Sequence, residues 1–194
     1  MSSAEQKLVE QHSDLIEIHR FKRCVYHGVE WQFGHLQPFA FREEIEPGLA
    51  VDVVVFFSCH CFTHNGNKDQ RDVIPRSEVY LDGGVFRVLN PDRYELSKRF
   101  MPQIVEKLRS RQIRVMGPPH DNYATFEETD IHGNPITYAV FFSVKRDRDR
   151  RKRLIMRVES AYPIEQLTKR HQKAGKVNLP VLLKKIYRGE KIKP

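Results

Sequence analysis

Hydrophobic and polar residues follow one another along the chain in blocks that predict several strands and one long helix. The strongest strand signal is 51–57, which is almost continuous Val and Phe and is therefore typical of a buried strand. Glycines at positions 83 and 84 supply the positive φ of a tight turn, so residues 77–90 are expected to form a hairpin. The other segments with strand character are 24–33, 122–128, and the two arms of a second hairpin, 135–145 and 154–161.

The segment 93–111 has the spacing of an amphipathic helix that packs one face on a sheet. Its apolar residues recur every three or four positions, at Tyr94, Phe100, Met101, Ile104, Val105 and Leu108. Asn90 is suited to cap the helix and Pro91 to occupy its first turn. Pro102 falls inside the pattern and is expected to kink or restart the helix.

These elements predict a single α+β domain, with a largely antiparallel sheet, one long helix packed on it and a basic C-terminal extension. Residues 1–13 are polar without periodicity, and they are expected to be disordered or frayed. The domain itself is expected over 14–167. The extension, 168–194, begins as a basic linker, and its apolar stretch at 179–187 is expected to dock as a short helix or strand.

The excess positive charge lies in the last quarter of the chain. The net charge is +8, yet residues 145–194 alone hold 17 Lys and Arg against 5 Asp and Glu. Charge concentrated on one segment favours a polyanionic partner, RNA rather than DNA, although a solvated basic tail is the alternative. The cations expected to contact nucleic acid are Arg148, Arg150, Arg151, Lys152, Arg153, Lys169 and Arg170.

A pair of thiols follows the strand 51–57. If strand geometry continued past Ser58, Cys59 and Cys61 would share one face of the sheet. Buried cysteines commonly behave as small hydrophobic residues, so both are expected to be packing residues. The alternative is a zinc site, which would need a second ligand pair such as Cys24 and His27.

Three histidines are candidates for acid–base chemistry. His60 and His64 stand where the strand 51–57 gives way to a polar loop, a position at which such groups are often displayed. His120 follows a proline-rich turn at the mouth of the strand 122–128, and the alternative there is a surface histidine. Metal-free RNA cleavage needs a base for the 2′-hydroxyl, an acid for the leaving 5′-oxygen and cations for the phosphorane.

The second hairpin adds two further candidates, Arg157 and Tyr162. Strand alternation sends Arg157 and Glu159 to one face and Tyr162 to the other. An arginine can hold a phosphate through two hydrogen bonds; alternatively, Arg157 pairs with Glu159 or faces solvent. Tyr162 is a candidate because a phenol, like His, Lys and Arg, can serve in RNA cleavage.

The sequence lacks the motifs that are typical of several classes of enzyme. The chain has no phosphate-binding glycine loop, no GxSxG elbow and no carboxylate cluster of the glycosidase kind, so no metal and no cofactor is expected. No stretch approaches the roughly 20 apolar residues that span a bilayer. The polar first eleven residues predict no secretory signal, and three cysteines do not make a disulfide framework. These patterns predict a cytoplasmic protein that does not enter a membrane.

Two resemblances extend this interpretation. A helix, a short strand and a long hairpin that ends in Ser160-Ala161-Tyr162-Pro163 resemble the bacterial ribonuclease-toxin superfamily, which groups barnase, EndoU, RelE and the tRNA-cleaving colicins. That resemblance covers about residues 91–163 and implies a small, metal-independent, RNA-cleaving α+β fold. Over most of the chain, the sequence also looks like bacterial proteins called stationary-phase growth adaptation proteins, which implies no established chemistry. The residues that carry this second likeness are Phe57-Ser58-Cys59-His60-Cys61-Phe62-Thr63, Arg93-Tyr94-Glu95-Leu96-Ser97 and Val158-Glu159-Ser160-Ala161-Tyr162.

The sequence therefore predicts a nucleic-acid-directed protein. The first expectation is a toxin-like or phage-related endoribonuclease in which His60 or His120 acts as base or acid and Arg157 holds phosphate. One alternative is a non-catalytic nucleic-acid or ribonucleoprotein binder that uses 145–153 and 169–193. The other is a modulator that uses its basic surface on an acidic protein partner. The oligomeric state is left open.

Overall fold

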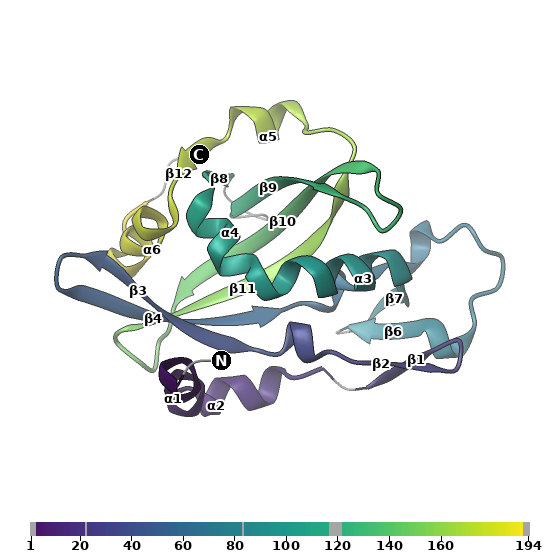
Figure 1. Cartoon of the computed structure of the whole chain (residues 1–194), viewed down its shortest axis with the longest axis horizontal. Helices are drawn as coiled ribbons and strands as arrows, with labels where there is room; N and C mark the ends of the chain where they lie inside the picture. Colours follow the sequence, from purple (N-terminus) through teal and green to yellow (C-terminus); the bar gives the residue numbers. More distant parts are fainter. Residues whose placement is uncertain (1–2, 22, 83, 117–121, 192–194) are drawn as a thin grey trace.

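A seven-stranded sheet forms the centre of the chain (Figure 1). The computed structural model describes residues 3–21, 23–82, 84–116 and 122–191. From edge to edge, the strands are β12 (Gly175–Val177), β8 (Ile113–Val115), β9 (Asn122–Thr129), β10 (Pro135–Arg146), β11 (Arg153–Ile164), β4 (Leu49–Phe57) and β3 (Phe39–Glu46). Neighbours in this sheet run antiparallel except for β11 and β4, which are parallel and pair Ile155 with Val54. The α+β class and the long β10–β11 hairpin predicted from the hydrophobic pattern are confirmed.

The long helix crosses one face of this sheet (Figure 1). It consists of α3 (Pro91–Phe100), a 3-10 turn η6 (Met101–Gln103) and α4 (Ile104–Ser110). The Asn90 side chain caps α3 by accepting a hydrogen bond from the backbone N–H of Arg93, and Pro91 occupies the first turn. The interruption falls at Pro102, as predicted, because proline cannot donate the helical hydrogen bond.

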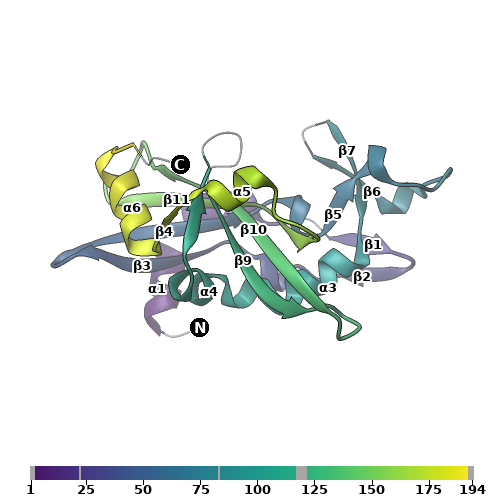
Figure 2. The ribbon, with the colours of Figure 1, turned by 90° about the horizontal axis from the view of Figure 1, so that it is seen from above.

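A smaller sheet and a hairpin lie at the opposite end of the molecule from α6 (Leu179–Arg188), as both ribbon views show (Figure 2). The small sheet has the order β5 (Thr63–Asn65), β7 (Val85–Leu89), β6 (Val79–Asp82), and β6–β7 is the predicted hairpin. The segment 24–33, which has strand character in the sequence, forms a second hairpin from β1 (Cys24–Tyr26) and β2 (Val29–Trp31). Short 3-10 turns connect these parts: η2 (Gly34–Leu36), η3 (Cys59–Cys61), η4 (Gly66–Lys68) and η5 (Arg76–Glu78).

The N-terminal segment differs from the expectation of a frayed end. It forms α1 (Ser3–Gln11), α2 (Ser13–Ile16) and a 3-10 turn η1 (Glu17–His19), which lie under β3 and β4 in Figure 1. Ile16 is 1% exposed and packs with Ala40, Val54 and Phe56, on the face of the sheet away from the long helix. Burial of these apolar side chains stabilises a segment whose polar composition gives little sign of order.

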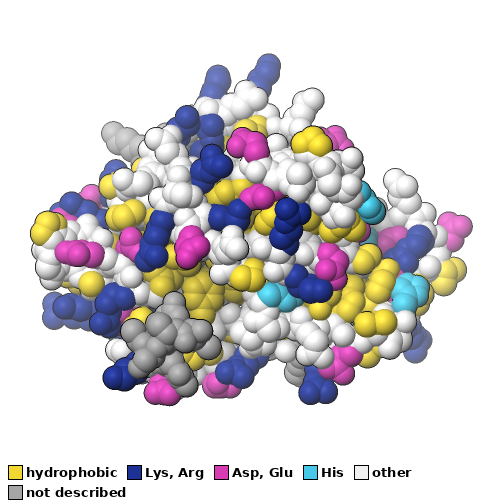
Figure 3. Space-filling model, viewed as in Figure 1, with side chains coloured by type: hydrophobic (Ala, Val, Ile, Leu, Met, Phe, Trp, Pro, Cys, Tyr) yellow, Lys and Arg dark blue, Asp and Glu magenta, His cyan; other side chains and the backbone are white. Residues whose placement is uncertain are grey.

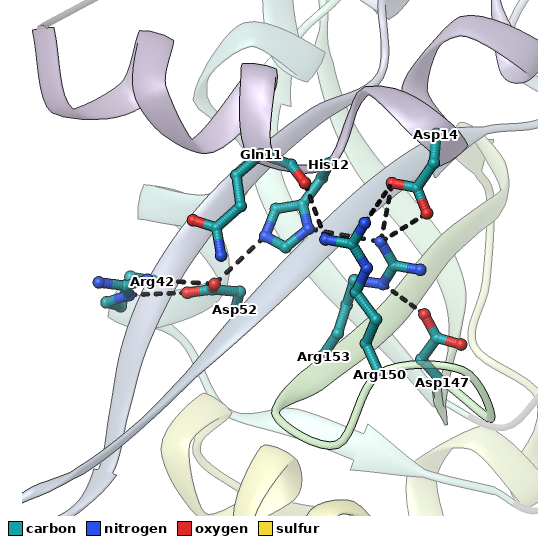
Figure 4. Close-up of polar contacts among 8 residues, drawn as sticks. All are labelled: Gln11, His12, Asp14, Arg42, Asp52, Asp147, Arg150 and Arg153. Carbon is teal, nitrogen blue, oxygen red and sulfur yellow. Dashed lines mark hydrogen bonds and ion pairs between the residues drawn. The ribbon is translucent and has the colours of Figure 1, made fainter.

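Charged groups anchor this segment to the sheet (Figure 4). His12 is 2% exposed, and its Nε2 donates to Asp52 Oδ2 on β4 at 3.2 Å. Arg153, at the start of β11, reaches Asp14 at 3.0 Å, while Arg150 donates to the backbone oxygen of Gln11 at 2.9 Å. The N-terminal segment and the β10–β11 loop are thereby held together around one buried arginine.

The C-terminal residues are also more integrated than a basic extension implies. After a short helix α5 (Lys169–Lys173), β12 pairs with β8 and forms an edge of the seven-stranded sheet. The predicted docking of 179–187 is confirmed, because α6 buries Leu179, Leu182 and Leu183 completely in the main core.

His35 is a half-buried imidazole whose protonation opposes folding. Its Nε2 lies 2.8 Å from Ser97 Oγ, and burial together with nearby Lys98 lowers the pKa of His35 to about 4. A histidine in the unfolded chain titrates near 6.5, so acidification from about pH 6.5 to 4 adds a proton to the unfolded state first and destabilises the fold. His35→Asn is expected to lose less stability than the parent over this range, measured by urea unfolding at each pH.

The matched control is His132→Asn, because His132 is exposed. This variant should follow the pH dependence of the parent protein. An NMR titration that gave His35 a pKa near 6.5 in the folded protein would contradict the assignment.

Candidate functional site

A cleft of about 570 Å³ opens on the face of the sheet away from the long helix. On one side, the N-terminal segment covers Ala40, Val54 and Phe56. Farther along the same sheet, a second apolar cluster includes Tyr123 and Phe141. The polar residues of the cleft floor are Ser143 and Lys145 of β10, Arg157 and Glu159 of β11, and Ser58 just after β4, and Phe56, Phe57 and Ile155 line the floor beside them.

The strand register places the floor residues in a row. Ser143 pairs with Arg157 across β10–β11, and Arg157 pairs with Phe56 across β11–β4. Glu159 lies two residues farther along β11; its Oε1 accepts a hydrogen bond from Ser143 Oγ at 2.9 Å, and its Oε2 lies 3.1 Å from Arg157 Nε. Two of the possibilities predicted for Arg157 are therefore both present: it pairs with Glu159, and it lies on an open face of the sheet.

One wall of the cleft carries an imidazole that the sequence patterns did not single out. The His19 ring lies on the Phe56 ring with centroids 3.9 Å apart. Burial, with a smaller effect of the nearby Arg157 charge, lowers the pKa of His19 below its ordinary value of 6.5. The shift favours the neutral form of the imidazole. The sequence feature that could have indicated a helix at this wall is the spacing of Leu8, Leu15 and Ile16, three apolar residues within a mostly polar segment.

The cleft has more positive than negative groups. Arg20, Lys145 and Arg157 line it, and Glu159 is its single carboxylate. Arg20 is paired with Glu17 of its own segment at 2.7 Å. Lys145 makes no ion pair with any residue that the structure describes, and it is exposed. Aromatic rings of Phe21, Phe56 and Tyr80 are also part of the lining.

The two cysteines at the end of β4 are packing residues, as predicted. Cys59 and Cys61 are 3% and 0% exposed, and burial raises the pKa of the Cys61 thiol to about 12. The predicted strand alternation beyond Ser58 is wrong, because these residues form the 3-10 turn η3, which the Ser58 side chain caps by accepting from the N–H of His60. The backbone oxygen of His60 accepts from Arg93, and His60 does not line the cleft.

His64 is held at both ring nitrogens. Its Nε2 donates to Asp69 Oδ2 at 3.0 Å, and its Nδ1 lies 3.3 Å from Asn90 Nδ2. Arg71, which forms hydrogen bonds with Asp69, lowers the pKa of that carboxyl far below its ordinary value. His64 therefore ties β5 to the following loop and the helix cap, and it does not line the cleft.

The other predicted catalytic residues are dispersed. Tyr162 stacks on Phe141 and lies under the guanidinium of Arg93, 4.6 Å from ring centroid to Cζ, and it does not line the cleft. His120 lies outside the described residues. Arg157 is the one predicted catalytic residue that the structure places in the cleft. Among residues 3–21, 23–82, 84–116 and 122–191, no three His, Cys, Asp or Glu side chains converge in a way that could hold a metal ion.

The residues predicted to contact nucleic acid differ in their exposure and pairing. Arg148, Arg151, Lys152 and Lys169 are exposed and form no ion pair within the described part of the chain. Arg150 is exposed but bound to the N-terminal segment. The prediction for Arg153 is wrong, because this residue is 3% exposed and its guanidinium is bound by Asp14 and Asp147. The side chain of Arg170 lies outside the described part.

The exposed cations of the β10–β11 loop extend the charge of the cleft. Lys145 of the cleft and Arg148 of the loop are only three residues apart in the same hairpin. In Figure 3, Lys and Arg side chains gather at the left end of the molecule, where this loop lies in Figure 1, and project again from the top near α5. Acidic side chains are interspersed on the same face, so the positive surface is patchy rather than continuous.

Comparison with known families adds one firm result. The sequence matches the YjaZ family over residues 23–187. The chain belongs to the YjaZ family. Within this YjaZ-family chain, the cleft floor lies inside the matched range and the wall that carries His19 precedes it. No curated protein and no solved structure is significantly similar to the chain. No helix in the described part is long and apolar enough to cross a membrane.

Proposed function

We propose that this YjaZ-family chain binds single-stranded RNA, with one phosphate in the cleft and further phosphates along the β10–β11 loop. The observation that carries the proposal is the pair of cations, Lys145 and Arg157, on a cleft floor next to aromatic rings. Phosphate contacts supply most of the affinity of proteins for nucleic acid. Aromatic side chains stack on unpaired bases of any sequence.

The dimensions of the cleft favour a single strand. A volume of about 570 Å³ suits one or two nucleotides, because small-molecule pockets of roughly 300–1,000 Å³ hold ligands of that size. Stacking on a ring requires an unpaired base, and at this wall the His19 ring covers Phe56, which is 5% exposed, so His19 is the ring that a base would meet. The exposed cations Arg148, Arg151 and Lys152 lie beyond the cleft in the same hairpin and would contact the continuing backbone.

The test is fluorescence anisotropy with a labelled twelve-nucleotide single-stranded RNA over a series of salt concentrations. Arg157→Ala is expected to weaken binding roughly 10- to 100-fold, since a charge-assisted hydrogen bond contributes about 1.5–3 kcal/mol. Lys145→Ala should weaken binding less and reduce the slope of log K against log salt by about 0.7, the value for one phosphate on a single strand.

The charge-matched control is Lys68→Ala, because Lys68 is an exposed cation in the loop beside the small sheet, away from the cleft. It should change affinity less than twofold. Equal affinities of Arg157→Ala and the parent would contradict a site in the cleft. Absence of RNA binding at low salt would contradict the proposed function and would favour an acidic protein partner.

A further inference from the structure

The edge strand β3 has a groove beside it that the proposed RNA binding does not use. β3 lies at one edge of the seven-stranded sheet, and Phe39, Ala40 and Phe41 at its start line a cavity of about 550 Å³. We propose that this groove binds an extended segment of another protein, which adds to the edge of β3 as a further strand. The inference does not rest on RNA binding, although Arg20 lines both cavities.

The two halves of β3 differ in how their edge is protected. The second half is charged, and Glu46 at its end is bound by Lys184 and Arg188 of α6. Charged side chains and covering helices commonly prevent another strand from pairing with an edge. The stretch 39–41 carries no charge, and in the described part of the chain its backbone pairs only with β4. Every second residue of this stretch therefore directs its N–H and C=O away from the sheet, where an added strand could pair with them.

Apolar side chains form both walls of the groove. The N-terminal helices contribute Val9 and Ile16 from one face of the sheet, and the long helix contributes Met101, Pro102 and Val105 from the other. β3 passes between these helices in Figure 1, and apolar side chains reach the surface there in Figure 3. A strand that is covered on both faces is typically a continuous run of apolar residues. The bound segment therefore needs about three or four successive apolar residues, the length of the uncharged stretch of β3.

The charge at the rim of the groove favours a cation on that segment. Arg109 is bound by Glu43 at 2.5 Å, and Arg20 is bound by Glu17 at 2.7 Å. Glu106 of α4 also lines the groove, but it is exposed and forms no ion pair with any residue that the structure describes. A carboxylate without a cation favours Lys or Arg in the partner, beside the apolar run.

The position of the edge between two walls favours a flexible segment over a second copy of this chain. A second β3 would bring its own helices on both faces, and these would meet the walls of the groove before the two edges came within about 4.8 Å, the spacing of paired strands. A segment without packed neighbours can enter the groove. Strand addition of this kind takes its affinity from main-chain hydrogen bonds and its specificity from the pockets beside them.

The first experiment selects ligands for the full chain from a phage library of random twelve-residue peptides. The enriched peptides are expected to share a short run of apolar, mainly β-branched residues next to Lys or Arg, and fluorescein-labelled synthetic copies should bind in anisotropy. Glu106→Lys should weaken the best peptide about 3- to 10-fold, because charge reversal replaces a weak attraction with a repulsion. The matched control is Glu165→Lys, which alters an exposed carboxylate just beyond β11 and should change affinity less than twofold.

The second experiment tests the hydrogen bonds of the added strand on the parent protein. N-methylation of the best peptide at alternate residues should weaken binding about tenfold or more, and methylation at the residues between them less than threefold, because an added strand directs every second N–H to β3. A selection that enriches no peptide, equal effects of methylation at all positions, or equal affinities of Glu106→Lys and the parent would overturn the proposal. A dimer in sedimentation that the peptide dissociates would assign the edge to a second copy and would also overturn it.

Discussion

Replacing Arg153 by Met is expected to lower the free energy of unfolding by about 3–5 kcal/mol. The Arg153 side chain is 2% exposed, and it contacts Asp147, which is 5% exposed, and Asp14. Methionine fills most of the space but leaves the Asp147 carboxylate buried without its cation. Removing one partner of a buried ion pair costs more than the pair itself contributes, because the remaining charge is poorly solvated. Urea unfolding of the two proteins measures the difference.

The neighbouring Arg151→Met is the matched control, since Arg151 is exposed in the same loop. It is expected to change stability by less than about 0.5 kcal/mol. The double variant Arg153→Met with Asp147→Asn should recover part of the loss, because the stranded carboxylate becomes a neutral amide. A loss below about 1 kcal/mol for Arg153→Met would show that water reaches Asp147.

Replacing Leu182 by Ala is expected to cost about 2–5 kcal/mol, the range for truncation of a fully buried leucine. Leu182 is 0% exposed and belongs to the main core. Its partner helix α4 and strand β3 surround the same part of the core. Thermal or urea unfolding measures whether α6 is an integral part of the fold.

Val181 provides the control on the same helix, because it is 39% exposed. Val181→Ala should lower stability by less than about 1 kcal/mol, or raise it slightly through the better helix propensity of alanine. Equal stability of Leu182→Ala and the parent would mean that α6 detaches from the core without loss of the remaining structure.

Local sequence patterns predicted those parts of the fold that depend on neighbouring residues. The capped start at Asn90, the break at Pro102 and the β6–β7 hairpin depend on contacts over a few positions, and each is present. The N-terminal helices could not be predicted in this way. Ile16 packs on an apolar surface formed by Ala40, Val54 and Phe56, which lie on distant strands. No hydrophobic periodicity within residues 1–13 indicates that such a surface exists.

In the candidate site, too, local sequence patterns predicted only those features that depend on neighbouring residues. Strand alternation placed Arg157 and Glu159 on one face, and their ion pair agrees with that. The prediction that Tyr162 lies on the opposite face is wrong, because the register of β10 and β11 shifts at Glu159, so Tyr162 pairs with Ala139 and packs on Phe141 on the same face as Arg157. His19 was not identified, since its position depends on a ring contact with Phe56 of a distant strand. His60 and His64 were singled out because they stand where the strand 51–57 gives way to a polar loop, yet their hydrogen bonds stabilise the turn and loop around them.

The parallel pairing of β4 with β11 limits when the sheet can assemble during protein synthesis. Val54 pairs with Ile155, so most of the chain must leave the ribosome before β4 acquires its second neighbour. Until then, the β3–β4 hairpin exposes an apolar edge strand, and such edges promote association between nascent chains. Contacts over so long a separation also slow folding. A ribosome that stalls before residue 153 would therefore hold a chain whose most hydrophobic strand has an unsatisfied edge, which is a substrate for chaperones or for aggregation.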